Sequence, residues 1–217
     1  YQRIYEDKRK GGKLYKLLRS QKTYRKRYGS GQQRRGMIKN RTSIDDRPAI
    51  VDQKIRIGDI EGDTVIGKNQ QGVIITLVDR VSRFTFATKA KSKHAKGVAQ
   101  GIINLLKPHQ HRCHTITVDN GKEFAFHELV AKQLQVDVYF AHPYHSWERG
   151  LNENTNGLLR QYFPKKTNFK KVTEQELQAA IFMLNHRPRK CLGYKTPFEV
   201  FYNLDILPLK TIFGCTS

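Results

Sequence analysis

The sequence predicts an α/β fold, a mixed five-stranded sheet with helices on both faces, preceded by a basic N-terminal arm. Two observations carry this prediction. After residue 50, three β-prone apolar runs follow one another with short connections, and helical and β-prone segments then alternate along the chain. Before residue 50, the chain is rich in Lys and Arg and poor in apolar residues.

The predicted strands are runs of β-branched, aromatic and aliphatic residues bounded by turn formers, and they cover 57–66, 72–79, 83–89, 114–118 and 136–140. The predicted helices have apolar residues at helical spacing, and they cover 94–107, 122–134, 149–162, a segment from Thr173 to before Pro188, and a short segment from Thr196 to Phe201. Thr173 and Glu176 form the pattern of a capping box.

The element order β-β-β-α-β-α-β-α-α is that of a ribonuclease H-like domain. Short connections make the first three strands an antiparallel meander, and right-handed crossovers add the last two strands. Asp63 then lies on the first strand and Asp119 at the carboxyl end of the fourth, where open α/β sheets place their sites. If those strands are neighbours, the two acids are neighbours too.

The charge of the chain indicates a polyanionic partner. Its 217 residues hold 40 Lys and Arg against 19 Asp and Glu, a formal net charge of +21. Residues 1–44 contain 15 of these cations and two acids, so this segment cannot bury a core, and we expect it to order on a partner. The predicted organisation is an arm and linker over 1–49, a core over 50–204 and a tail over 205–217. The arm residues expected to bind DNA are Lys8, Arg9, Lys10, Arg25, Lys26, Arg27, Arg34 and Arg35.

Membrane and disulfide classes are disfavoured. No apolar run approaches the roughly 20 residues of a membrane span. The three cysteines are scattered and odd in number, which is typical of a reducing compartment. His109, His111, Cys113 and His114 crowd together, but no second ligand pair lies at finger spacing, so an ordinary polar turn is favoured over zinc.

Three acids stand out as candidate catalytic residues and metal ligands. Asp63 interrupts a β-prone run, Asp119 ends another before Asn120-Gly121, and Glu153 follows near the start of a helix. Carboxylates that meet repel each other unless a cation lies between them, and Mg²⁺ prefers such oxygen ligands. Two Mg²⁺ ions about 3.5–4 Å apart would clamp the attacking and leaving oxygens of a phosphodiester. Mn²⁺ is expected to substitute.

The helix over 149–162 predicts further contacts. Arg149, Glu153, Asn156 and Arg160 share one face, so Arg149, Asn156 and Arg160 are candidate phosphate ligands. The alternative is an exposed Arg149–Glu153 ion pair. Trp147, in the loop over 141–148, is a candidate to stack on bases of a frayed DNA end; the alternative is a core position.

Other acids remain open as ligands. Glu148 could replace Glu153, and Asp59 or Glu61 could replace Asp63. Asp79 is expected to be structural, and Glu123 to be a first-turn helix acid.

Four long segments resemble the transposases of the insertion sequence 30 family. They are Ile57-Gly58-Asp59-Ile60-Glu61-Gly62-Asp63-Thr64-Val65-Ile66-Gly67, Val118-Asp119-Asn120-Gly121-Lys122-Glu123-Phe124, the segment from Arg149 to Pro164, and the segment from Asn185 to Tyr194. The second is shared with retroviral integrases. The 33 residues between Asp119 and Glu153 are similar to the spacing of the aspartate-aspartate-(35)-glutamate class.

The resemblance implies a metal-dependent transposase that cleaves element ends and joins the 3′-hydroxyl to target DNA. It implies double-stranded DNA partners (terminal inverted repeats and target), a synaptic dimer or higher multimer, and a bacterial cytoplasmic, nucleoid-associated location. It also implies an upstream helix-turn-helix, of which Ile4-Tyr5 is the expected remnant. The alternatives are a retroviral-type integrase or structure-specific nuclease, or a catalytically silent DNA-binding derivative.

Overall fold

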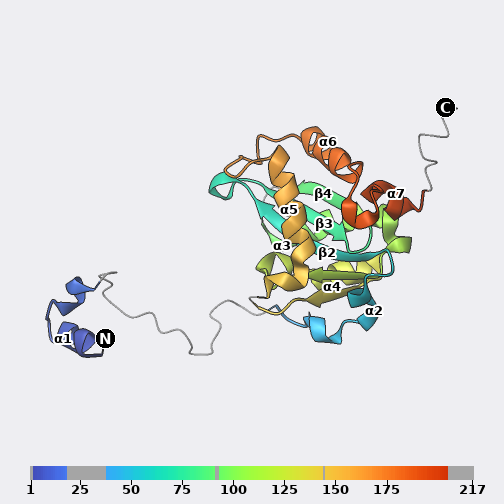
Figure 1. Cartoon of the computed structure of the whole chain (residues 1–217). Helices are drawn as coiled ribbons and strands as arrows, with labels where there is room; N and C mark the ends of the chain where they lie inside the picture. The colour runs from blue at the N-terminus through green and yellow to red at the C-terminus, as the bar shows by residue number, and fades with distance from the viewer. Residues whose placement is uncertain (1, 19–37, 91–92, 144, 205–217) are drawn as a thin grey trace. The chain divides into compact units, whose positions relative to one another are not determined.

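The computed structural model describes residues 2–18, 38–90, 93–143 and 145–204 (Figure 1). The chain divides into two compact units, Tyr1–Met37 and Ile38–Ser217. In the first unit, helix α1 (Gln2–Arg9) and the 3₁₀ turn η1 (Leu14–Leu17) contain no buried residue, and the Lys8 ammonium lies 5.1 Å from the Tyr15 ring centre. The predicted DNA-binding residues Arg25, Lys26, Arg27, Arg34 and Arg35 lie outside the described residues.

The second unit is built on a mixed sheet of six strands in the order β1-β6-β5-β2-β3-β4. The strands are β1 (Thr42–Ser43), β2 (Asp59–Ile66), β3 (Val73–Asp79), β4 (Thr85–Ala90), β5 (Thr115–Val118) and β6 (Asp137–Phe140). The meander β2-β3-β4 is antiparallel, as predicted, while β5 pairs parallel to β2, and β6 parallel to β5. The ribonuclease H-like arrangement is therefore confirmed.

The sixth strand was not predicted. β1 pairs parallel to β6 through two residues only, which is too short for an alternating hydrophobic pattern to show in the sequence. It is followed by η2 (Ile44–Asp46) and α2 (Ala49–Gln53), and Ile38 packs into the main core. Residues 38–49, predicted as part of the arm and linker, thus belong to the unit that contains the sheet.

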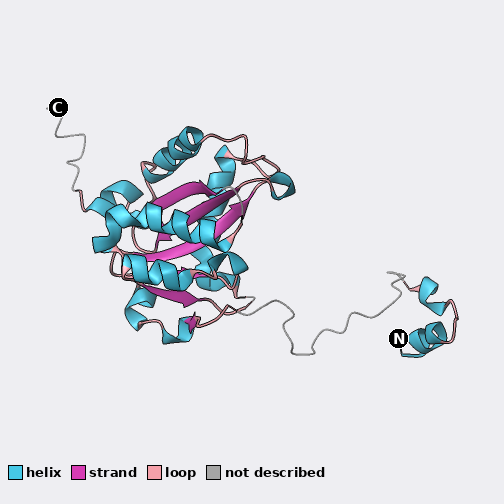
Figure 2. Ribbon diagram, turned by 180° about the vertical axis from the view of Figure 1, so that it is seen from behind, coloured by secondary structure: helices cyan, strands magenta, loops and turns pink. Residues whose placement is uncertain are grey.

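Helices cover both faces of the sheet, as Figure 1 and the reverse view in Figure 2 show. One core contains apolar residues of α3 (Ala95–Leu106), α4 (His127–Leu134) and α7 (Pro197–Tyr202), and a separate core contains those of α5 (Gly150–Tyr162) and α6 (Glu174–Asn185). The remaining 3₁₀ turns are η3 (Lys68–Gln70), η4 (Lys107–Arg112), η5 (Lys122–Phe124), η6 (Ser146–Arg149) and η7 (Lys190–Leu192).

Two predicted helix starts differ from the structure. The helix predicted over 122–134 is the short turn η5 followed by α4, and α5 begins at Gly150, so Arg149 belongs to the turn before it. The predicted capping box at α6 is confirmed: the Thr173 hydroxyl accepts from the Glu176 amide, and the Glu176 carboxylate accepts from the Thr173 amide. No described helix is long and apolar enough to cross a membrane.

Asn185 generates a stability prediction. This buried side chain at the end of α6 bonds both backbone groups of Thr85, with the Thr85 N–H donating at 2.9 Å and the Thr85 carbonyl accepting at 2.9 Å. Asn185→Ala leaves two buried backbone groups unpaired, so the free energy of unfolding should fall by about 2–3 kcal/mol in urea denaturation. Gln178→Ala, on the exposed side of the same helix, should cost less than about 1 kcal/mol. Equal losses in the two variants would contradict this account.

Candidate active site

Asp63 and Asp119 are brought together by the pairing of β2 with β5. The two strands run parallel, with Asp59 opposite Thr115 and Glu61 opposite Thr117. Because side chains alternate along a strand, continuing this register by two positions places Asp119, just past the end of β5, beside Asp63 on the same face. The two side chains are 25% and 37% exposed, so both carboxylates are open to solvent.

A tight turn fixes the Asp119 carboxylate. Its Oδ1 atom accepts a hydrogen bond from the Gly121 amide at 2.8 Å, which is the side-chain-to-backbone bond of an Asx turn. A Cβ atom at residue 121 would lie 2.7 Å from Asp119 Oδ1 and 2.5 Å from the Glu123 carboxylate. Glycine is therefore favoured here, because a larger residue would have to displace one of these two carboxylates.

Arg149 lies between the two acids. Its Nη1 atom is 3.6 Å from Asp63 Oδ1, and its Nη2 atom is 3.4 Å from Asp119 Oδ2. The same guanidinium donates to the Gly62 carbonyl at 3.3 Å. One guanidinium, only 12% exposed, thus balances two carboxylates. The alternative of an Arg149–Glu153 ion pair is wrong.

Asn156 holds Asp63 from the next turn of α5. Its Nδ2 atom donates to Asp63 Oδ2 at 2.8 Å, and its Oδ1 atom accepts from the Thr76 hydroxyl at 3.1 Å. Arg160 donates to the Ile66 carbonyl at 3.2 Å. Arg149, Asn156 and Arg160 are thus partnered within the protein, and their contact with DNA stays a prediction.

Glu153 lies on the exposed side of α5, between two residues that fix the helix on the sheet. One is Asn156; the other is Asn152, whose backbone N–H lies 3.4 Å from Glu61 Oε2. The Glu153 carboxylate has no hydrogen-bond or ion-pair partner among the described residues. A ligand of Glu153 would displace no protein contact, whereas the two Asp63 oxygens already contact Asn156 and Arg149.

The electrostatics of Asp63 favour a cation. Burial raises the pKa of this carboxyl above its usual value, the Arg149 guanidinium lowers it, and the nearby Asp119 charge raises it again. Carboxylate oxygens are the ligands of hard divalent cations, so Asp63, Asp119 and Glu153 fit Mg²⁺ by the chemistry of their donor atoms.

The two other acids on β2 are buried and have partners within the protein. Asp59 is 1% exposed and accepts two bonds from Arg56 and one from the Thr115 hydroxyl. Glu61 is also 1% exposed, lies 3.6 Å from Arg80, and has a pKa raised by burial. Neither carboxylate is open to solvent as Asp63 is.

Asp79 and Glu123 have structural partners. Asp79 accepts from the Gly58 amide and from the amide and hydroxyl of Ser82, as expected for a structural acid. Glu123 is buried in η5 and pairs with Lys93 at 2.6 Å and with the Thr64 hydroxyl.

The remaining alternatives are decided by burial and position. Trp147 is 69% exposed, so its predicted alternative, a core position, is wrong. Glu148 contacts His142 and His145, not Asp63 or Asp119. Cys113 is buried, and burial raises its pKa to about 12; within the described residues, the histidines near it form no group that could hold a metal.

Comparisons with known proteins agree with this geometry. Residues 55–146 match the integrase core domain family. The transposase for insertion sequence element IS4351 of Bacteroides fragilis is 52% identical over 202 residues, which cover 93% of this chain and 62% of that protein. Transposase InsI for insertion sequence element IS30A of Escherichia coli (strain K12) is 38% identical over 92% of this chain and 54% of its own length.

Solved structures show the same fold. A chain of the simian T-cell lymphotropic virus intasome, in complex with PP2A regulatory subunit B56 gamma, superposes with a TM-score of 0.57 at 23% identity, over 70% of this chain and 57% of that one. The catalytic core domain of BIV integrase gives a TM-score of 0.53 at 24% identity, over 67% of this chain and 93% of that one.

Fold and site together define the integrase core class of ribonuclease H-like proteins. Within that class, the chain belongs to the family of insertion sequence 30 transposases. It spans 62% and 54% of the length of the two relatives described above.

The position of Arg149 generates a prediction about metal-free stability. Arg149→Gln leaves Asp63 and Asp119 facing each other without a cation. The free energy of unfolding of this variant, measured with a chelator present, should therefore be about 1–2 kcal/mol lower than that of the parent chain. Added Mg²⁺ should then raise the melting temperature of the variant more than that of the parent, because the metal replaces the lost charge. Arg187→Gln, at an exposed site, serves as the control. Identical Mg²⁺ responses in all three proteins would show that Arg149 does not balance the acids.

Proposed function

We propose that this chain carries the catalytic core of a DNA transposase that cleaves transposon ends and transfers the 3′-hydroxyl into target DNA. Asp63, Asp119 and Glu153 are the proposed catalytic residues. The observation that carries the proposal is that Asp63 and Asp119 lie side by side at the two central strands of the sheet and share the Arg149 guanidinium, in a member of this transposase family.

The three carboxylates are the proposed ligands of two Mg²⁺ ions, and Mn²⁺ is expected to substitute. When bound, such ions lower the pKa of water and stabilise charge on phosphodiester oxygens. The chain's own residues orient the ligands: Asn156 fixes one oxygen of Asp63, and the Gly121 amide fixes one oxygen of Asp119. Each aspartate keeps its other oxygen directed at Arg149. We expect this guanidinium to exchange a carboxylate for a DNA phosphate when substrate binds, since arginine suits both anions.

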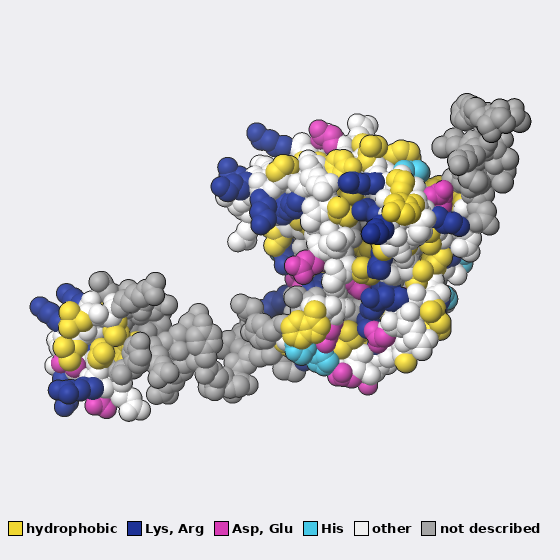
Figure 3. All heavy atoms as spheres, viewed as in Figure 1, with side chains coloured by type: hydrophobic (Ala, Val, Ile, Leu, Met, Phe, Trp, Pro, Cys, Tyr) yellow, Lys and Arg dark blue, Asp and Glu magenta, His cyan; other side chains and the backbone are white. Residues whose placement is uncertain are grey.

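A basic surface near the end of α5 supports DNA as the partner. The turn between β2 and β3 and the connection from α5 to α6 carry exposed lysines, namely Lys68, Lys165, Lys166, Lys170 and Lys171. The two segments are joined by a hydrogen bond from the Lys68 amide to the Thr167 carbonyl at 2.8 Å. Figure 3 shows Lys and Arg side chains gathered at this end of the unit. Phosphate contacts of this kind give affinity without sequence choice.

Further partners follow from the same proposal. The double-stranded DNA includes terminal inverted repeats and target DNA, and the chain acts in a synaptic dimer or higher multimer in the bacterial cytoplasm, associated with the nucleoid. The exposure of Trp147 supports its proposed stacking on bases of a frayed end.

A strand-transfer assay on an oligonucleotide with pre-cleaved ends tests the function. Nicking without joining would favour the nuclease alternative.

The catalytic acids have a specific expected phenotype. Asp63→Asn, Asp119→Asn and Glu153→Gln should each reduce cleavage and joining at least about 1,000-fold, because each removes a metal ligand whose charge stabilises the transition state. DNA affinity measured in the same buffer should change by less than about threefold, since these acids do not bind phosphate. Asp137→Asn, an exposed acid at the start of β6, is the matched control and should stay active. Activity in any of the three variants would remove that residue from the site.

The arm should contribute salt-sensitive DNA affinity. Deleting residues 1–37 leaves the sheet-containing unit whole and removes 13 Lys or Arg residues. The slope of log K against log salt concentration should become shallower by about 0.9 for each DNA phosphate that the arm neutralises in the parent chain. Circular dichroism of the truncated chain checks that the fold is kept. An unchanged slope would show that the arm does not lie on DNA.

A further inference from the structure

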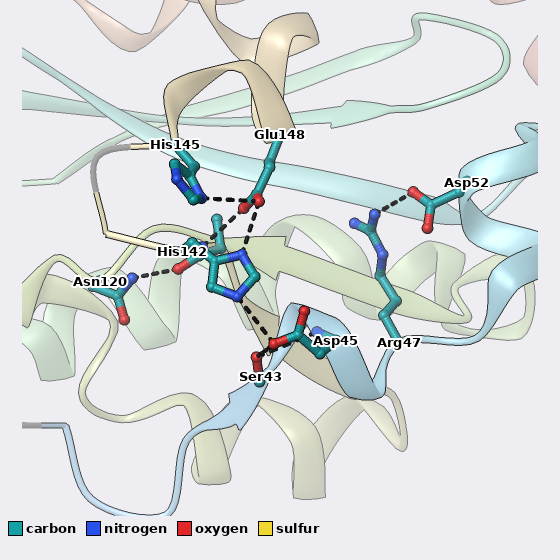
Figure 4. Close-up of polar contacts among 9 residues, drawn as sticks. Ser43, Asp45, Arg47, Asp52, Asn120, His142, His145 and Glu148 are labelled. Carbon is teal, nitrogen blue, oxygen red and sulfur yellow. Dashed lines mark hydrogen bonds and ion pairs between the residues drawn. The ribbon is translucent and has the colours of Figure 1, made fainter.

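A second group of metal-binding side chains lies in the segment that connects β6 to α5. His142, His145 and Glu148 follow one another at a spacing of three residues, and one ligand atom from each lies within 4.8 Å of the other two. Figure 4 shows the two imidazoles and the carboxylate turned toward one another, with Asp45 on the far side of His142. None of these residues belongs to the acid site described above.

The distances within this group suit a small transition-metal ion. His142 Nδ1 is 2.8 Å from Glu148 Oε1, and His145 Nδ1 is 3.3 Å from the same oxygen. Two ligand atoms of a tetrahedral zinc ion, each about 2.0–2.2 Å from the metal, lie roughly 3.3–3.5 Å apart. All three ligand atoms lie within 4.8 Å of one another, so side-chain rotations can bring them to one ion.

His142 and Glu148 are already oriented by other contacts. His142 Nε2 is 3.0 Å from Asp45 Oδ2, and that carboxylate also accepts from the Ser43 hydroxyl at 2.7 Å. A carboxylate at one ring nitrogen directs the lone pair of the other nitrogen to a metal, as in carboxylate–histidine–zinc sites. Glu148 is fixed in turn, because its Oε2 atom accepts from the His142 backbone N–H at 2.8 Å.

His145 supplies an independent sign of a ligand. Its Nδ1 atom is buried and makes no hydrogen bond with the described residues, although it lies beside Glu148. The ring is held against Trp147, with ring centres 4.4 Å apart. A buried ring nitrogen without a hydrogen bond is uncommon, and metal coordination would satisfy it.

We propose that His142, His145 and Glu148 bind a borderline divalent cation of the Zn²⁺ type, with water as the fourth ligand and Asp45 as the outer partner of His142. Two imidazoles and one carboxylate suit zinc, whereas the three carboxylates of the acid site suit Mg²⁺. The ion joins the segment after β6 to the turn that leads into α5. Arg149, which contacts Asp63 and Asp119, follows Glu148 directly, so the ion fixes the start of the helix that carries Glu153.

Metal content of the untagged 217-residue chain tests the proposal. Cys191 and Cys215 are replaced by Ser so that thiols do not compete for the ion. After incubation with Zn²⁺ and gel filtration, the protein should retain one zinc per chain. His145→Ala and Glu148→Gln should weaken zinc binding at least tenfold, and Asp45→Asn by about 10–100-fold, since outer partners of a ligating histidine matter to that extent. His111→Ala, at an exposed histidine elsewhere, should bind as the parent does.

Two further measurements locate the ion. Co²⁺ in place of zinc should give the intense visible absorption of tetrahedral coordination, and this signal should be lost in His145→Ala. The double variant Asp63→Asn, Asp119→Asn should keep its zinc, and the emission of Trp147, the single tryptophan, should change on zinc addition.

Three results would overturn the proposal. The first is zinc retention in both His145→Ala and Glu148→Gln. The second is loss of zinc in the double aspartate variant, which would place the ion at the acid site. The third is no zinc bound by the parent at 100-fold molar excess, which would leave His142 as an imidazole hydrogen-bonded between two carboxylates. Circular dichroism of each variant confirms that a loss of metal is not a loss of fold.

Discussion

The arrangement of this site depends on the parallel pairing of β2 with β5. That register sets Asp63 beside Asp119 at the point where β5 ends and its backbone turns away from the sheet. Two neighbouring carboxylates repel each other, so positive charge between them stabilises the fold. In the structure this charge is the guanidinium of Arg149.

Helix α5 links this electrostatic requirement to the rest of the molecule. Its buried side packs in the smaller core through Leu159. Near its N-terminus, the backbone N–H of Asn152 contacts the Glu61 carboxylate. Asn156 reaches Asp63 from the same helix. A shift of α5 would therefore disturb packing, a buried carboxylate and the candidate site together. The segment that leads into the helix is held by His142, which contacts both Glu148 and Asp45.

Holding Asp63 in its ionised form costs stability. Burial raises the pKa of Asp63, so keeping that carboxylate ionised at neutral pH costs folding free energy. Asp59 and Glu61 are more deeply buried on the same strand and are matched by Arg56 and Arg80. Of these three acids, only Asp63 lies far enough along β2 for its side chain to reach solvent. Position along one strand thus separates an acid available to ligands from two acids that stabilise the fold.

From the sequence alone we could predict the order of the main strands and helices, the antiparallel meander and the candidate acids. Local sequence patterns predict these features. The patterns are hydrophobic periodicity, capping residues such as Thr173, and long motifs around Asp63 and Asp119. The two-residue strand β1 left no such pattern, because its pairing with β6 is decided by contacts distant in sequence. Likewise, helical spacing placed Arg149 with Glu153, but tertiary structure directs it to Asp63 and Asp119, where the unbalanced charge lies. The contact of Asp45 with His142 also joins residues far apart in the chain. Local sequence fixes which groups each element carries, and only the packed sheet decides which charges must neutralise one another.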